Sequence, residues 1–139
     1  MALSFKIITP DQVVLDSPVE YVYLPGSLGE MGILDHHAAL ITALEPGVLR
    51  YKIPDEEERS MVVGNGYVQV DQDEILMVTD LALNSAQIDE SSVEKAIEQA
   101  KEALKAREAM TREEEAKFEA DLAKQMMVLN FKRKRPYQS

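Results

Sequence analysis

The residues best suited to chemistry lie together in one short, glycine-rich segment. Residues 25–38 carry carboxylates at Glu30 and Asp35 and adjacent imidazoles at His36 and His37. Carboxylate and imidazole groups ligate zinc and perform acid–base catalysis. Their spacing suits neither task, because adjacent residues of an extended strand point to opposite faces and the chain has no third histidine. We therefore expect no metal site and no catalytic residue, and we assign the histidines to turn capping and local hydrogen bonds.

The residues up to Ala86 alternate short β-rich runs with turn residues. Many short strands at this spacing predict a β-sandwich, or flattened barrel, over residues 1–86. Turns are expected at residues 9–11, 16–18, 54–56, 64–66 and 71–73. The expected strands are 3–9, 13–15, 19–24, a very short 32–34, 47–53, 60–63, 67–70 and 75–79.

Residues 87–139 change to helical spacing and predict two helices packed as an antiparallel hairpin. Each helix has a capping-box pattern near its start, Ser91 with Glu94 and Thr111 with Glu114. The turn between the helices is expected around residues 109–111. The expected apolar stripes are Val93, Ala96, Ile97, Ala100 and Leu104 on the first helix and Phe118, Leu122, Met126 and Leu129 on the second.

A two-helix seam this narrow buries little apolar surface, and that burial barely offsets the entropy lost on ordering the chain. The hairpin should therefore depend on a further surface, either the β domain or a partner. A permanently docked hairpin and a conformational switch both remain open at this point.

Composition excludes several classes of function. The chain has no cysteine, so it has no disulfide, thiolate metal site or cysteine nucleophile. Residues 1–86 hold 14 acidic and 4 basic residues and residues 87–139 hold 11 of each, so the net charge of −10 lies in the first part. That part would repel nucleic acid and anionic lipid. No apolar run reaches membrane-spanning length.

Three motifs in order resemble the epsilon subunits of F-type ATP synthases, which are called delta in mitochondria. In that family a Gly-Glu-apolar-Gly-Ile-apolar stretch precedes a His-Ala pair and a Pro-Gly-apolar-apolar-Arg stretch. Residues 29–34, 37–38 and 46–50 match these motifs here, and a helical hairpin follows. The family usually has proline two residues after the histidine, where this chain has Ala39. The resemblance covers essentially the whole chain and is stronger before Ala86.

The resemblance implies a non-catalytic rotor subunit of the central stalk that needs no cofactor. Such a subunit couples the gamma subunit to the membrane c-ring for proton-driven ATP synthesis and inhibits ATP hydrolysis through its hairpin. The matching residues place Glu30 at the c-ring interface, where an exposed carboxylate would face basic loops. They place His37 near the gamma subunit.

The basic end of the second helix has two interpretations. Cations stabilise a helix C-terminus and Pro136 stops the helix, so ordinary capping is one. In the family, the extended hairpin inserts among the catalytic alpha and beta subunits and places basic residues near an acidic loop there. The candidates for such inhibitory contacts are Lys124, Lys132, Arg133, Lys134 and Arg135.

Some bacterial members of the family bind ATP at the hairpin through an Ile/Leu-Asp-x-x-Arg-Ala motif together with arginines on the second helix. This chain begins the motif with Ile88 and Asp89 but has Ser92 in place of the arginine and Val93 in place of the alanine. A lysine–alanine pair at residues 95–96 would substitute only after an insertion. Without the arginines, bidentate phosphate contacts are lost, so we expect weak or no ATP binding.

The family interpretation predicts an isolated monomer that meets the membrane only through the complex. It would lie on the cytoplasmic face of a bacterial plasma membrane or on the stromal face of a thylakoid. One alternative is a free-standing β-sandwich adaptor that dimerises through the alanine-rich hairpin, which the mass in solution would reveal. Another is a small metalloenzyme using Glu30, Asp35 and His37, which metal analysis would reveal.

Overall fold

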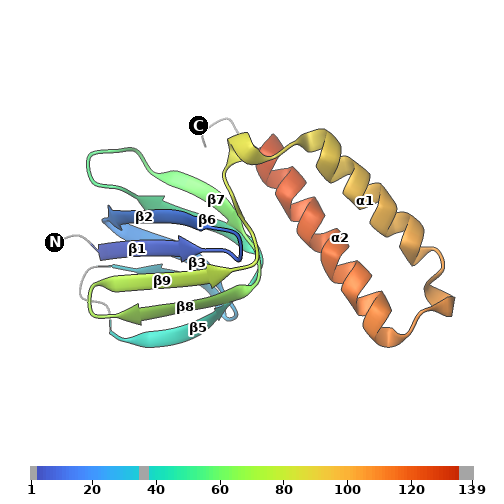
Figure 1. Ribbon diagram of the computed structural model, residues 1–139, viewed down its shortest axis with the longest axis horizontal. Helices are drawn as coiled ribbons and strands as arrows, with labels where there is room; N and C mark the ends of the chain where they lie inside the picture. Colours follow the sequence, from blue (N-terminus) through green and yellow to red (C-terminus); the bar gives the residue numbers. More distant parts are fainter. Residues whose placement is uncertain (1–2, 35–37, 135–139) are drawn as a thin grey trace. The chain divides into compact units, whose positions relative to one another are not determined.

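The computed structural model describes residues 3–34 and 38–134, and it divides the chain into two compact units, residues 1–85 and 86–137. The first unit is built of strands and the second of helices (Figure 1). This order confirms the predicted β-sandwich followed by a helical hairpin. Asp35, His36, His37 and Arg135 lie outside the described residues.

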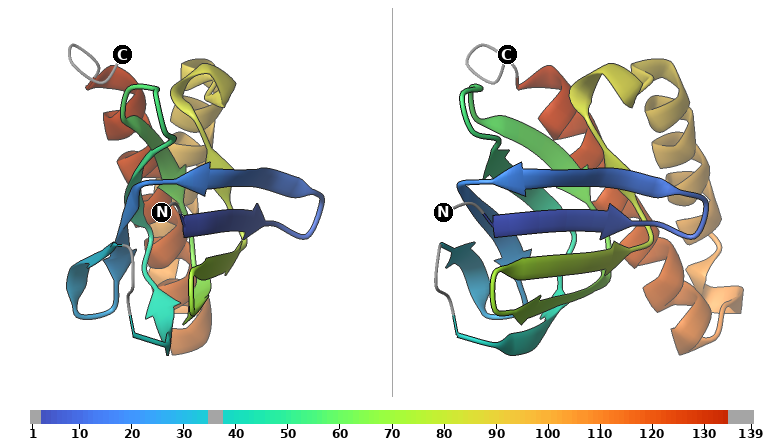
Figure 2. Two further views of the ribbon diagram at one scale, coloured as in Figure 1. Left: turned by 90° about the vertical axis from the view of Figure 1, so that its left-hand side faces the viewer. Right: turned by 60° about the vertical axis from the view of Figure 1, so that its left-hand side comes forward.

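The strands of the first unit pair in one continuous path that folds into two layers (Figure 2). One layer has the order β10-β7-β6-β3, with β4 also paired to β3, and the other has the order β5-β8-β9-β1-β2. A single residue pair between β3 and β5, Gly26 with Leu44, joins the layers. The strands are β1 Leu3–Ile8, β2 Val13–Val19, β3 Tyr21–Gly26, β4 Gly29–Ile33, β5 Leu40–Leu44, β6 Gly47–Lys52, β7 Arg59–Val63, β8 Gly66–Asp71, β9 Glu74–Thr79 and β10 Ala82–Leu83.

The pairing of β1 with β9 is parallel, whereas the other described strand pairs are antiparallel. Its register runs from Ser4 opposite Glu74 to Ile8 opposite Val78. β1 is therefore an interior strand, held by β2 on one side and β9 on the other.

The core of this unit lies between the two layers. Alternate residues of the strands are buried, as shown by Leu3, Phe5 and Ile7 on β1. The ring of Phe5 meets the ring of Tyr51 on β6 edge to face, with centroids 6.0 Å apart. Because the two rings come from different layers, this contact ties the layers together in the apolar interior.

Parts of the predicted strand pattern were wrong. The expected turn at residues 16–18 does not exist, because β2 continues through Pro18 to Val19. Proline is tolerated there since β2 ends the strand order, where no further strand needs its missing N–H. The strand β5 was not predicted at all. Ile41 and Ala43 are exposed while Leu44 is buried, so apolar residues on both faces hide the alternation.

The second unit is a helical hairpin, as predicted. It contains α1 Glu90–Leu104 and α2 Arg112–Arg133, joined through the short 3-10 helix η2 Arg107–Ala109, while η1 Ser85–Gln87 precedes α1. The expected turn at residues 109–111 covers only the end of the connection, which begins after Leu104 and includes η2. No helix in residues 3–34 and 38–134 is both long enough and apolar enough to span a membrane.

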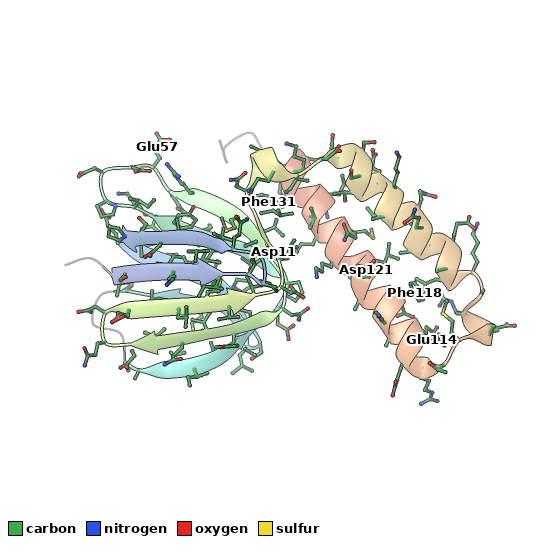
Figure 3. The ribbon with its side chains drawn as sticks, in the orientation of Figure 1. Asp11, Glu57, Glu114, Phe118, Asp121 and Phe131 are labelled. Atoms are coloured by element: carbon green, nitrogen blue, oxygen red, sulfur yellow. The ribbon has the colours of Figure 1, made fainter. Side chains whose placement is uncertain are left out.

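The start of α1 differs from the prediction, whereas the start of α2 agrees with it. Asp89, and not Ser91, caps α1, because its carboxylate accepts a hydrogen bond from the Ser91 backbone N–H at 3.1 Å. α2 has the predicted capping box, in which Thr111 and Glu114 bond to each other's backbone N–H. Figure 3 shows Glu114 at this start of α2 and Phe118 one turn further along.

The predicted stripe is correct for α1 but only partly for α2. Val93, Ile97, Ala100 and Leu104 of α1 are buried. On α2 the buried residues are Val128 and Phe131, while Phe118, Leu122 and Leu129 are half-buried and Met126 is 46% exposed.

Candidate functional site

Glu30 lies at the start of β4, beside the tip of the hairpin that β3 and β4 form. The register places Glu30 opposite Pro25 and Gly29 opposite Gly26, so Ser27 and Leu28 make the tip. The Leu28 side chain is fully exposed to solvent. The hairpin therefore presents an apolar side chain and a carboxylate close together.

Arg50 of β6 binds Glu30 across the intervening strand β3. Its Nη2 lies 3.2 Å from Oε2 of Glu30, and its Nη1 lies 2.8 Å from Oε1 of Glu58. The guanidinium also stacks over the ring of Tyr23, with Cζ 4.6 Å from the ring centroid. The hydrogen bond to Glu58, followed by the weaker bond to Glu30, raises the pKa of Arg50. Three contacts thus fix this guanidinium on an exposed sheet face.

Tyr21 completes the network from β3. Its hydroxyl donates a hydrogen bond to Oε2 of Glu58 at 3.1 Å, so the two oxygens of Glu58 have separate partners. The rings of Tyr21 and Tyr23 meet edge to face with centroids 5.3 Å apart. Burial, with a further contribution from the bond to Glu58, raises the pKa of Tyr21. We call Tyr21, Tyr23, Glu30, Arg50 and Glu58 the Arg50 network.

A glycine makes room for this network. Gly32 lies opposite Tyr23 in the register of β3 and β4. A β-carbon at Gly32 would stand 2.7 Å from Cε1 of Tyr23, which is closer than carbon atoms can approach without displacement. The ring of Tyr23 can therefore lie flat on the sheet only because residue 32 has no side chain.

The surface around Glu30 is suited to binding a positively charged partner. The side chain of Glu30 is 56% exposed, and its one described cationic contact is Arg50. Within the described part of the chain, no group of three His, Cys, Asp or Glu side chains is placed to hold a metal ion. A second ion pair, Lys52 with Glu20 at 3.2 Å, lies nearby on β6 and at the end of β2.

The open ends of the helical hairpin form a second candidate site. Arg133 near the end of α2 binds two acids of the first turns of α1, with Nε 2.7 Å from Oε1 of Glu90 and Nη2 2.8 Å from Oε2 of Glu94. The bond to Glu90 contributes most to raising the pKa of Arg133. One guanidinium thus joins the beginning of the hairpin to its end. We call this set of contacts the Arg133 latch.

The other predicted basic residues have different surroundings. Lys124 and Lys132 are half-buried on α2, and Lys134 is exposed at the C-terminal cap, where its backbone N–H bonds to the carbonyl of Asn130. Arg133 is the candidate that reaches α1, through its ion pairs with Glu90 and Glu94. Glu90 was not predicted to have a role, and Glu94 was predicted only as a capping-box partner of Ser91, although their spacing of four residues on one helix face was a usable signal.

The degenerate nucleotide motif serves as a helix start in this structure. The carboxylate of Asp89 accepts hydrogen bonds from the Ser91 backbone at 3.1 Å and from Oγ of Ser92 at 2.9 Å. These bonds, that of Ser92 first, lower the pKa of Asp89. Ile88 is buried. The serine that replaces the motif's arginine therefore reinforces the helix cap.

Comparison with known proteins gives matches across both units. The family described as ATP synthase, Delta/Epsilon chain, beta-sandwich domain matches residues 2–85. The chain is 36% identical over 107 residues to the ATP synthase epsilon chain of Sulfurovum sp. (strain NBC37-1), which covers 77% of this chain and 83% of that protein. It is also 36% identical over 108 residues to the chloroplastic ATP synthase epsilon chain of Phaeodactylum tricornutum, covering 73% of this chain and 80% of the relative.

A solved structure supports the fold. A chain in the cryo-EM structure of the Euglena gracilis mitochondrial ATP synthase, comprising OSCP/F1/c-ring, superposes with a TM-score of 0.75 at 21% sequence identity. The match covers 91% of this chain and 79% of the other. The same succession of β unit and helices therefore occurs in both chains.

Proposed function

The chain belongs to the ATP synthase delta/epsilon family, and on that basis we propose that it is a non-catalytic subunit of the central stalk that couples the gamma subunit to the membrane c-ring. It would bind the membrane only through the complex. The bacterial and chloroplastic relatives support a place on the cytoplasmic face of a plasma membrane or on the stromal face of a thylakoid.

The observation that carries this proposal is the exposed carboxylate of Glu30 beside the protruding tip of the β3–β4 hairpin. The side chain of Glu30 is 56% exposed and Leu28 is fully exposed. A negative group at a protruding tip suits basic loops of the ring, since complementary charges favour and orient association. His37 remains our candidate contact for the gamma subunit.

Reconstitution tests this role. A matching synthase stripped of its epsilon subunit is supplied with wild-type chain, with Glu30→Lys or with the control Glu20→Lys, and ATP-driven proton pumping is measured. Glu20 is also an exposed acid of the β unit, but its partner is Lys52. We expect Glu30→Lys to require about tenfold more protein for half-maximal pumping, because like charges would then face each other. Equal titrations for all three proteins would contradict the proposed c-ring contact.

We propose further that the hairpin inhibits ATP hydrolysis by opening and binding the catalytic subunits. The Arg133 latch supports this role, because its three side chains are 44–54% exposed and exposed ion pairs contribute little stability. An acidic loop of a catalytic subunit would offer Arg133 the same kind of partner as Glu90 and Glu94. Lys124, Lys132, Lys134 and Arg135 would add contacts along the same end of the hairpin.

A crosslinking experiment tests the opening. The chain contains no cysteine, so Glu90→Cys with Arg133→Cys can be joined selectively by a bifunctional thiol reagent. The control pair, Glu102→Cys with Lys105→Cys, joins two residues at one end of the hairpin and leaves the open ends free. We expect the first crosslink to abolish suppression of ATP hydrolysis and the control to preserve it. Suppression by both crosslinked forms would show that opening is not required.

A further inference from the structure

We propose that Arg50 is a positioning residue that orients the Glu30 carboxylate toward the c-ring, and that Glu58 is the anchor that holds Arg50 when Glu30 engages its partner. This inference rests on the proposed function and adds two residues to its interface.

The first argument is the geometry of Arg50. Its two terminal nitrogens donate hydrogen bonds to different carboxylates, Nη2 to Glu30 and Nη1 to Glu58. Glu30 lies on β4 and Arg50 on β6, with β3 between them. The arginine therefore reaches across a whole strand, over the ring of Tyr23, to meet Glu30.

The second argument is that Glu30 has no such support on its own strand. The backbone around it is a hairpin end containing Gly29 at φ +116°, and the residues of the tip are exposed. A glutamate in that position would sample several rotamers, and ordering it on binding would cost free energy. The bond to Arg50 removes part of that cost before the partner arrives, which is preorganisation.

The third argument concerns charge. If the guanidinium of Arg50 followed the Glu30 carboxylate toward a basic partner, the two positive charges would repel each other. The bond to Glu58 is the shorter of the two, and the Tyr21 hydroxyl fixes the other oxygen of Glu58. When a cation of the c-ring binds Glu30, Arg50 therefore still contacts the carboxylate of Glu58 and the aromatic ring of Tyr23. Lysine cannot reproduce this arrangement, because one ammonium does not provide the planar fork that spans two carboxylates.

Lys52 provides a matched control on the same strand. It lies two residues beyond Arg50 on β6, so the two side chains share one face. It forms a comparable exposed ion pair with Glu20 at 3.2 Å. Removing Lys52 therefore removes one surface ion pair and leaves both ion pairs of Arg50 in place.

The experiment is a double-mutant cycle on the binding of the full chain to the immobilised membrane sector of the matching synthase. Dissociation constants are measured for wild type and for Glu30→Gln, alone and combined with Arg50→Met or Lys52→Met. We expect Glu30→Gln to weaken binding about tenfold in the wild-type and Lys52→Met backgrounds but only about twofold in the Arg50→Met background. Thermal unfolding of each variant verifies that it is folded.

Glu58→Gln and Arg50→Lys extend the test without altering Glu30. Each should weaken binding about threefold, because each loosens the support of Glu30 while keeping the arginine or its charge. Tighter binding of Arg50→Met than of wild type would overturn the proposal, since Arg50 would then compete with the partner. An undiminished effect of Glu30→Gln in the Arg50→Met background would overturn it as well. If Glu30→Gln has no effect in any background, the c-ring contact itself fails.

Discussion

The ring of Tyr23 covers Gly32 on the neighbouring strand so closely that a β-carbon at residue 32 would lie 2.7 Å from Cε1 and 3.0 Å from Cδ1 of the ring. The guanidinium of Arg50 lies over the same ring, 4.6 Å from the centroid. The position of the ring that supports the guanidinium therefore depends on the absence of a side chain at residue 32.

Gly32→Ala should destabilise the β unit and disturb the Arg50 network together. The methyl group must push the Tyr23 ring away, which we expect to cost about 1–3 kcal/mol of unfolding free energy. Chemical denaturation measures this loss. In a Tyr23→Ala background the added methyl meets no ring, so Gly32→Ala should then cost much less. Equal costs in the two backgrounds would show that the ring does not restrict residue 32.

Thr111→Ala should weaken the start of α2, whereas Ser91→Ala should leave α1 nearly unchanged. Thr111 caps α2 through its side chain, and its loss should cost about 1 kcal/mol. Ser91 lies inside α1, and the cap there is Asp89. Amide hydrogen exchange in the first turn of each helix reports both effects. Faster exchange at α1 in Ser91→Ala would restore the sequence-based cap assignment.

Arg133→Gln should modestly raise the fraction of chains in which the hairpin is open, since exposed ion pairs contribute little stability. The variant loses both ion pairs that join the two helix ends, and exposed ion pairs are also weakened by salt. Spin labels placed near the open ends of wild type should move apart in the variant and, to a smaller extent, in wild type at high salt. Lys105→Gln is the control, because it removes only the local pair with Glu102. Unchanged label distances in Arg133→Gln would mean that apolar packing alone closes the hairpin.

Tyr21 should lose its proton at a higher pH than an ordinary tyrosine does. Its pKa is raised above 10.0, mainly by burial and then by the bond to Glu58. A group whose pKa is higher in the folded state stabilises the protein below its unfolded pKa, and this stabilisation disappears as the pH rises through the folded pKa. The contribution of Tyr21 is therefore complete below pH 10.0 and is lost above it.

Phenolate absorbance measures this titration. A step of the wild-type curve above pH 10.0 should be missing in Tyr21→Phe and should shift toward lower pH in Glu58→Gln. A wild-type curve that Tyr21→Phe leaves unchanged at its alkaline end would contradict the assignment.

The isolated chain should be a monomer. The family interpretation requires no self-association, whereas a free-standing adaptor would pair through the alanines of the hairpin. Light scattering coupled to gel filtration should give the mass of one chain at all concentrations used. A stable dimer that the Arg133→Gln variant also forms would favour the adaptor.

Local signals in the sequence predicted the features that depend on neighbouring residues. Thr111 and Glu114 lie three residues apart, and the capping box they predicted is present. The Arg50 network could not be predicted in this way. Glu30 and Arg50 meet because β4 and β6 both pair with β3, and strand order is set by the whole core rather than by any local pattern. The missed strand β5 has a different origin, since exposed Ile41 hides the alternation of apolar and polar residues.

Because β1 pairs with β9, which follows much later in the chain, the β unit cannot be completed until β9 has been synthesised. β1 is synthesised well before its partner β9, which ends only at Thr79. Until then β1 is paired along one edge only, with β2, and its other edge has no partner strand. The apolar side chains of Phe5 and Ile7 have no completed core to pack into. Contacts this distant in sequence form late and leave nascent chains prone to aggregation. The β unit thus becomes complete only as translation reaches the helical hairpin, and the apolar residues of β1 remain prone to aggregation until then.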